Sequence, residues 1–395
     1  MLVTVEEAPA TSIGYGGGLE GYTKSRNTGP DGQPEDHFEF APRGFFDIGR
    51  RNLFGANRSV SLYTRVSLRP RDAPDNPELD GTGIGFSEYR VVGTYRQPRW
   101  YGANELTVTG ILEQGVRTSF NFARKGFNVD VVRRLSPAVR TSGRYSLSST
   151  RTFDERLDEE DQATIDRLFP QVRLSGFSGA VARDTRDDLL EPTRGMFLSG
   201  EGTLAARALG GQVGYIKSYV QGFMFHLLPM KKPVVFASRA ALGLAQGFER
   251  EVQTVDAEGN PETEIVDDLP SSERFFAGGD TSIRGFELDR VGAPDTISSN
   301  GYPTGGNAVL LLNGELRFPV WKKVGAVVFV DGGNVFRRVN EFDIGELRGS
   351  YGFGIRYHSP IGPVRVDLGF KMDRRIVAGA LEPLTVFHFS LGQAF

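Results

Sequence analysis

The sequence contains no cysteine, and only 4 of its 395 residues are histidine. The absence of Cys excludes disulfide bonds and thiolate metal sites. No histidine pair has the spacing typical of metal ligands, and no Gly-x-Ser-x-Gly nucleophile motif is present; the histidines are His37, His226, His358 and His388. We therefore expect no metal, no other cofactor and no enzymatic activity.

Long apolar runs are also missing. No stretch approaches the roughly 18 apolar residues of a membrane-spanning helix, and the most apolar run, 324–330, has only the length of a strand. The mean hydropathy of −0.28 would normally indicate a soluble protein, but a membrane barrel lowers this value because only alternate residues face lipid. The net charge of −3 provides no basic field for nucleic acid. Residues 1–7 do not resemble a signal peptide, so we expect the chain to derive from a longer precursor.

The C-terminal third has a clear period of two. Apolar side chains alternate with polar or glycine residues in 351–358, 363–372 and 384–395. Such alternation predicts β-strands with one continuous apolar face. The other face of 363–372 carries Arg365, Asp367 and Lys371. Charges at successive inward positions favour a water-filled lumen, with the apolar face toward lipid.

The same rule predicts about sixteen strands, joined alternately by short turns and long loops, as in an outer-membrane barrel. An even strand number places both chain ends on the periplasmic side. A β-propeller would need a repeat of roughly 40–50 residues, and none is visible. The predicted strands are 11–22, 37–50, 58–71, 84–98, 102–115, 118–134, 138–152, 170–184, 194–208, 212–228, 233–249, 305–319, 323–336, 348–359, 362–373 and 384–395.

Two other motifs favour ordinary structural interpretations. Residues 16–21 match Gly-x-Gly-x-x-Gly, but no crossover helix follows, so we interpret them as part of a weakly pairing, glycine-rich strand. The acidic run 154–161 lacks the glycine-containing spacing of a calcium loop. We interpret it as a solvated outer loop.

The connection 250–304 is unusually long, and we expect it to lack regular secondary structure. Its first part, 255–268, is polar and is expected to be mobile. Its second part contains Gly278-Gly279 and then Ser282-Ile283-Arg284-Gly285-Phe286, which suggests a loop folded into the lumen. A buried Arg284 would need counter-charges. The alternation in 309–318 and 324–331 places Glu315, Phe329 and Asp331 on the inner wall, where the two carboxylates could hold it.

The segment Ser282-Ile283-Arg284-Gly285-Phe286 resembles the (Val/Ile)-Arg-Gly-(Phe/Tyr) motif of the BamA- and TamA-type outer-membrane assembly-factor superfamily. That superfamily also includes organelle import barrels and two-partner secretion transporters. Glu315, Phe329 and Asp331 resemble the family's wall partners of this arginine. Residues 184–188 and 192–195 resemble its periplasmic turn, and 359–363 with Phe395 resemble its last hairpin and C-terminal signal. Ile283 replaces the commoner Val.

The resemblance implies an outer-membrane β-barrel over 11–395, preceded in 1–10 by the end of a periplasmic POTRA domain. It implies a bacterial outer-membrane assembly factor that inserts unfolded barrel precursors, in contact with outer-membrane lipids, POTRA domains and accessory lipoproteins. A TamA-like or two-partner secretion barrel, or a plain porin, remains an alternative. The latch motif 282–286 is expected to act structurally.

Closing such a barrel requires strand 11–22 to pair with strand 384–395. The first strand is rich in glycine, which lowers strand stability, so this lateral seam is expected to be the weakest pairing in the barrel. An openable seam would expose a strand edge to an incoming precursor. The seam residues are Gly14, Gly16, Gly17, Gly18, Ser390, Gly392 and Phe395.

Overall fold

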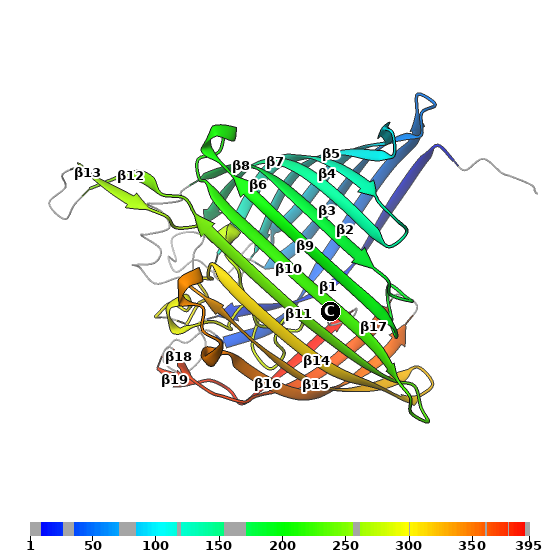
Figure 1. Cartoon of the computed structure of the whole chain (residues 1–395), viewed down its shortest axis with the longest axis vertical. Coiled ribbons are helices and arrows are strands. Elements are labelled where there is room, and N and C mark those ends of the chain that lie inside the picture. The colour runs from blue at the N-terminus through cyan, green and yellow to red at the C-terminus, as the bar shows by residue number, and fades with distance from the viewer. Residues whose placement is uncertain are drawn as a thin grey trace, which may run out of the picture.

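The computed structural model describes residues 9–26, 35–70, 84–116, 120–153, 171–255, 261–299, 301–359, 362–377 and 379–391. Sixteen strands form one antiparallel sheet, each hydrogen-bonded to the next, and the sheet curves into a barrel wall (Figure 1). These strands are β1 (Thr11–Arg26), β2 (Glu35–Leu53), β3 (Arg58–Pro70), β4 (Ile84–Tyr101), β5 (Asn104–Val116), β6 (Asn121–Arg134), β7 (Val139–Phe153), β8 (Val172–Asp184), β9 (Gly195–Ala205), β10 (Tyr215–Leu228), β11 (Val234–Gly247), β14 (Ala308–Trp321), β15 (Val324–Phe336), β16 (Arg348–Ser359), β17 (Gly362–Lys371) and β20 (Thr385–Leu391).

The predicted fold class, an all-β, antiparallel up-and-down barrel of about sixteen strands with its long loop in the lumen, is confirmed. Several strands are longer than predicted: β1 continues to Arg26, and β2 runs from Glu35 to Leu53. The fifth outer connection, 206–214, is longer than predicted because β9 already ends at Ala205 and a 3₁₀ turn (Arg207–Leu209) follows. The expected POTRA remnant falls almost entirely outside the described residues.

The period-two alternation positions the two faces of the wall as predicted. In the paired strands β15 and β16, Val328 lies opposite Phe353, and Val330 lies opposite Tyr351. All four side chains are exposed on the outer face, whereas Phe329 and Asp331, which alternate with the two valines along β15, are buried. The outer face is therefore apolar, as lipid contact requires.

The long connection between β11 and β14 corrects one expectation. It contains a hairpin of β12 (Arg250–Val255) and β13 (Pro261–Val266), which projects away from the wall in Figure 1. Its two strands are mostly polar, and their few Val and Ile residues do not recur at every second position, so the sequence carried no period-two signal for them. A second, two-residue ladder, β18 (Ile376–Val377) and β19 (Ala380–Leu381), lies before β20.

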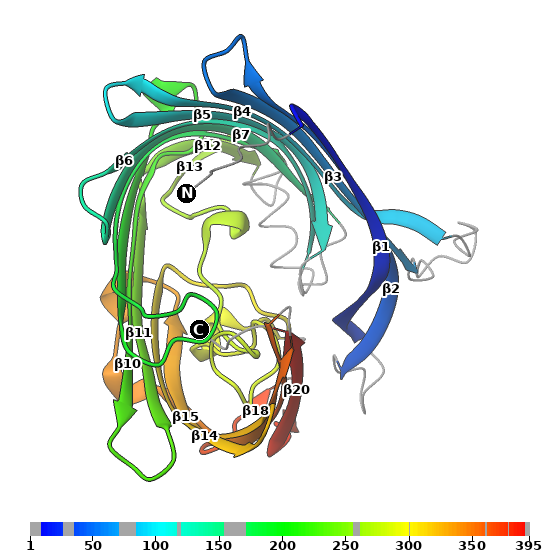
Figure 2. The ribbon, with the colours of Figure 1, turned by 90° about the vertical axis from the view of Figure 1, so that its right-hand side faces the viewer.

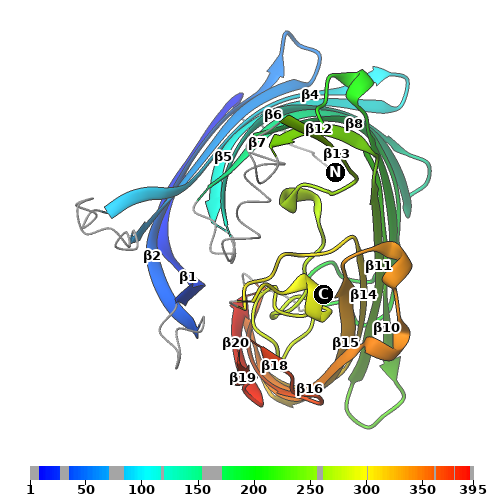
Figure 3. The same cartoon turned by 90° about the vertical axis from the view of Figure 1, so that its left-hand side faces the viewer.

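The first and last strands of the sheet remain edges. Among the described residues, β1 pairs with β2 alone and β20 with β17 alone. Figures 2 and 3 show them as the two free borders of the wall. The pairing expected between the first and last strands is thus absent from the described part of the chain, and we call the gap between β1 and β20 the seam. No described helix is long and apolar enough to span a membrane.

Candidate functional site

The connection from 267 to 307 lies inside the barrel. In Figures 2 and 3 it forms the yellow segment within the curve of the wall, beside β14 and β15. Its apolar side chains pack on the inner face of the wall, which removes them from water. This cluster consists of Ala277, Ile283, Phe286 and Val291 from the loop and of Ala241, Val309, Leu311 and Val335 from the strands.

Glycines allow the tip of this loop to turn sharply. Gly278 and Gly285 have φ values of +116° and +86°, in the left-handed region that other residues avoid. Gly285 also approaches the wall so closely that a Cβ on Gly369 of β17 would lie 2.5 Å from Gly285 Cα. Glycine is therefore required on both sides of this contact.

Arg284 lies at the centre of the site and is only 1% exposed. Its Nε donates to Asp331 Oδ2 at 2.7 Å, and its Nη2 donates to Asp331 Oδ1 at 3.0 Å. Its Nη1 donates to Glu315 Oε2 at 2.8 Å. The guanidinium also stacks on Phe329, 3.7 Å from the ring centre. The structure thus brings together Arg284 and the three wall residues predicted from sequence, in the two-pronged geometry that favours arginine.

The charges around Arg284 decide its protonation. Burial alone would lower the pKa of Arg284, but the charge and hydrogen bonds of Asp331, together with the charge of Glu315, outweigh burial and raise the pKa above its ordinary value. The guanidinium is therefore permanently charged. A buried permanent charge with two carboxylate partners fixes the loop in one position.

Further wall residues extend the network beyond the predicted partners. Arg317 donates to Glu315 at 2.6 Å, and Arg356 donates to Asp367 at 2.6 Å. The Nη2 atom of Arg365 donates to the main-chain oxygen of Asp280 in the loop at 2.8 Å. Cations and carboxylates therefore alternate across the inner faces of β14 to β17, and each buried charge has a nearby counter-charge.

Main-chain atoms of the loop tip are also held by the wall. Gly285 N donates to His388 Nε2 at 2.9 Å, and Ser350 Oγ donates to the carbonyl oxygen of Arg284. Asn313 Nδ2 donates to the carbonyl oxygen of Ser282 at 2.6 Å. His388 belongs to β20, so the loop tip is bonded directly to the strand that forms one border of the seam.

The site contains four further wall residues that the sequence pattern did not identify: Ser350, Arg365, Lys371 and His388. The signal was present, because Arg365 and Lys371 occupy inward positions of a period-two strand. That interpretation assigned them to a water-filled lumen, and it was wrong for this part of the wall: Arg365 and Lys371 are 1% and 2% exposed. The loop covers them, and Lys371 Nζ lies 5.3 Å from the centre of the Phe286 ring.

The predicted seam residues lie on the two edge strands. Gly14, Gly16, Gly17 and Gly18 are in β1, and a Cβ on Gly16 would lie 2.6 Å from the ring of Phe45 in β2. Ser390 is in β20, and its hydroxyl oxygen is buried without a hydrogen-bond partner among the described residues. Gly392 and Phe395 lie outside the described residues.

The turn between β8 and β9 is built around one carboxylate. Asp187 accepts hydrogen bonds from Thr193 Oγ1 at 2.5 Å, from Thr193 N at 2.9 Å and from Arg194 N at 3.0 Å. The hydrogen bond from the Thr193 side chain, followed by those from main-chain amides, holds the pKa of Asp187 well below its usual range. The same turn also contacts β16, because Glu191 Oε1 lies 2.6 Å from His358 Nδ1.

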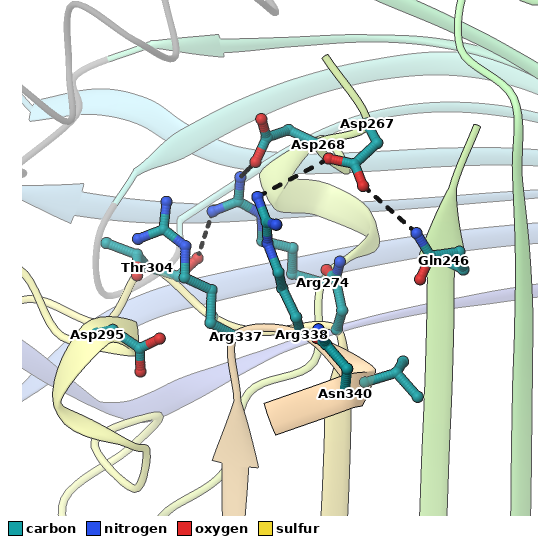
Figure 4. A pocket seen from close by; sticks show the side chains of 12 residues that line it. Gln246, Asp267, Asp268, Arg274, Asp295, Thr304, Arg337, Arg338 and Asn340 are labelled. Atoms are coloured by element: carbon teal, nitrogen blue, oxygen red, sulfur yellow. Dashed lines mark hydrogen bonds and ion pairs between the residues drawn. The ribbon is translucent and has the colours of Figure 1, made fainter. Parts of the chain in front are cut away.

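A cavity of about 470 Å³ lies between the base of the loop and the connection after β15 (Figure 4). Arg338 lies 4.0 Å from Asp267, and Arg274 lies 4.0 Å from Asp268. The Arg274 Nη1 atom also donates to the Thr304 carbonyl oxygen at 3.2 Å. The Arg338–Asp267 contact joins the loop base to the connection after β15, and the two contacts of Arg274 lie within the loop. The lining is balanced in charge, with three arginines and three aspartates. In the part of the chain that the structure describes, no group of three or more metal-ligating side chains occurs.

Comparisons with known proteins found a matching family model and curated relatives. A family model described as the Omp85 superfamily domain matches residues 52–395. The outer membrane protein assembly factor BamA of Nitratidesulfovibrio vulgaris is 28% identical over 216 residues, 54% of this chain and 24% of that protein. The protein of the same name from Neisseria meningitidis serogroup B is 25% identical over 389 residues, 88% of this chain and 44% of that protein. The chain thus spans less than half the length of these curated relatives.

A solved structure shows the same fold. The crystal structure of BamA from Haemophilus ducreyi lacking POTRA domains 1–3 superposes with a TM-score of 0.69 at 17% sequence identity. The superposition covers 98% of this chain and 71% of that one.

Proposed function

The chain belongs to the Omp85 superfamily, and from this membership we propose that it folds and inserts β-barrel precursors into the bacterial outer membrane through its seam. It is an outer-membrane barrel with relatives named as assembly factors. The observation that carries the proposal is the pair of unpaired edges: in the described residues β1 bonds only to β2, and β20 only to β17.

An unpaired strand edge in a membrane is a template for another strand. Its N–H and C=O groups have no water to bond inside a bilayer, so pairing with an incoming strand is strongly favoured. A precursor that presents its own terminal strand to such an edge gains backbone hydrogen bonds without first forming a complete sheet. The seam therefore suits strand addition.

The latch, which we define as residues 282–286, has a structural role in this proposal. It is bonded to Asp331 in β15, to Ser350 in β16 and to His388 in β20. These bonds hold the last strands of the wall in a fixed position beside the seam. The border formed by β20 is thereby kept in register, whereas β1 is held by β2 alone.

The substrates are unfolded outer-membrane protein precursors, and the partners are outer-membrane lipids, POTRA domains and accessory lipoproteins. The two borders of the seam would act by binding alone, so the proposal includes no catalytic residue. A plain porin is disfavoured because the loop and its buried network fill the part of the lumen beside β14 to β17. A two-partner secretion or TamA-like barrel would use the same wall with a different cargo.

A disulfide across the seam tests the proposal. Because the chain has no cysteine, the double variant Gly17→Cys/Ser390→Cys can form only this bridge in an otherwise cysteine-free full-length protein. Oxidation should reduce precursor assembly more than about tenfold, and a reducing agent should restore it. The matched control is Gly93→Cys/Gly110→Cys, which joins residues already paired in β4 and β5 and should leave assembly unchanged. Full assembly by the oxidised, cross-linked seam variant would refute the proposal.

A further inference from the structure

The short turns at one end of the barrel carry a repeated charge pattern. Four of them carry two consecutive basic residues, either within the turn or at the end of the strand before it: Arg50-Arg51, Arg133-Arg134, Lys231-Lys232 and Lys322-Lys323. These turns follow β2, β6, β10 and β14, so in an up-and-down sheet they all lie at the same end and are spread around the wall. We define these four basic pairs as the basic ring.

The basic ring is available to a partner. All eight side chains are exposed, and the described residues give none of them an ion pair. The stretches 50–58, 133–140, 228–234 and 319–324 contain no Asp or Glu at all. The positive charges of the ring are therefore not neutralised within their own turns.

The opposite end of the wall has the opposite charge. The outer connections 154–170 and 249–268 are rich in Asp and Glu and poor in Lys and Arg. The net charge of −3 for the whole chain thus conceals a separation of charge along the barrel axis. Such a separation orients a protein between surfaces of different potential.

Each basic pair has an exposed apolar neighbour. These neighbours are Phe54, Leu135, Met230 and Trp321, which are 88%, 58%, 61% and 67% exposed. Lys322 Nζ lies 5.1 Å from the centre of the Trp321 ring. In another turn Arg99 precedes the exposed Trp100 and Tyr101. Apolar and aromatic side chains beside cationic groups are typical of the boundary between lipid tails and headgroups.

We propose that the basic ring binds the anionic phospholipid headgroups of the leaflet that the turns meet, and selects them over zwitterionic headgroups. A ring around the perimeter fits a membrane surface, which surrounds the barrel, better than a protein partner, which would contact one side. The assignment of this end to the periplasmic leaflet rests on the proposed function, but the lipid selectivity does not.

The chain provides its own probes for a test. Both of its 2 tryptophans, Trp100 and Trp321, lie at this end. The Trp100→Phe variant leaves Trp321 alone, next to the pair Lys322-Lys323. The chain is refolded into two sets of vesicles with the same ratio of phosphatidylcholine to phosphatidylglycerol. In one set only the phosphatidylcholine has brominated tails, and in the other only the phosphatidylglycerol has them. Brominated tails quench tryptophan fluorescence on contact.

The brominated anionic lipid should quench Trp321 more strongly than the brominated zwitterionic lipid does. We expect the anionic lipid to be enriched about fivefold around Trp321, which corresponds to contact with one basic side chain. The enrichment should fall toward one in high salt, and also in K322Q/K323Q on the same background. R50Q/R51Q removes the same charge from a distant turn and should leave the enrichment at Trp321 unchanged. Circular dichroism confirms that each variant has folded.

Equal quenching by both lipids would overturn the proposal, and so would an enrichment that persists in K322Q/K323Q. The first of these results would assign the ring to an acidic protein surface instead. Both leaflets of these vesicles are identical and no precursor is present. A negative result for lipid selectivity would therefore not contradict the proposed assembly function, and a failure of the assembly experiment would not contradict lipid selectivity.

Discussion

The ion pairs in the first half of the barrel wall have solvent-exposed cations, whereas those in the second half have buried cations. Between β4 and β7, the arginines that pair with Glu105, Glu113 and Asp130 have side chains that are 41% to 55% exposed. In the latch and β16 to β17, the cations Arg284, Arg356, Arg365 and Lys371 are at most 6% exposed. The folded loop causes the difference, because it covers one half and not the other.

Exposure decides what these pairs contribute. An exposed pair is screened by water and contributes about 0–1 kcal/mol, whereas breaking a buried pair leaves an uncompensated charge. The C-terminal half is therefore a fixed frame, in which the loss of one partner is costly. The N-terminal half, whose free border is the glycine-rich β1, lacks such a frame. We therefore expect β1 to be the more flexible of the two borders of the seam.

The largest expected effect comes from Arg284→Ala. It leaves Asp331 buried without its cation, removes one of the cations bonded to Glu315, and should destabilise the barrel by about 3–5 kcal/mol. Arg90→Ala removes a 45% exposed partner of Glu113 and should cost no more than about 1 kcal/mol. Urea unfolding of the refolded barrels in phosphatidylcholine vesicles measures both.

A third variant sharpens this comparison. Arg284→Lys keeps the charge but cannot donate two parallel hydrogen bonds to Asp331, so its stability should fall between those of the wild type and the alanine variant. Equal losses for Arg284→Ala and Arg90→Ala would show that the two halves do not differ.

A smaller effect is expected from packing. Gly369→Ala places a Cβ 2.5 Å from Gly285 Cα, and such overpacking should cost about 1–3 kcal/mol. The matched change is Gly93→Ala in β4, where a Cβ would meet nothing within 4 Å; it should be neutral or slightly stabilising. The same unfolding experiment applies, and a Gly369→Ala barrel as stable as the Gly93→Ala barrel would contradict the close packing of the latch.

The sequence predicted the wall well because a strand's faces follow from local alternation. Period two was enough to locate the strands and to place Glu315, Phe329 and Asp331 inside. It could not show that Arg365 and Lys371 face a loop instead of water, because the covering segment is more than sixty residues away along the chain. Long-range contacts of this kind leave no periodic signal.

Two other features were hidden for different physical reasons. The hairpin β12–β13 is short and mostly polar, and its few apolar residues do not alternate with polar ones, so its sequence resembled that of a loop. Whether the seam is open or closed depends on whether β1 and β20 form hydrogen bonds with each other. The sequence pattern predicts that both segments are strands but not whether they pair. The bond from Gly285 to His388 was missed because a single inward histidine in a strand has many possible partners.

The most direct test of the central claim is to ask which strand an incoming precursor touches. A photo-crosslinking amino acid is placed at Gly17 in β1 of the full-length protein, and at Gly93 in the middle of the wall as the control. During assembly, we predict a crosslink from position 17 to the C-terminal strand of the precursor and none from position 93. Efficient assembly without a crosslink from position 17, or with equal crosslinking from both positions, would contradict strand addition at the seam.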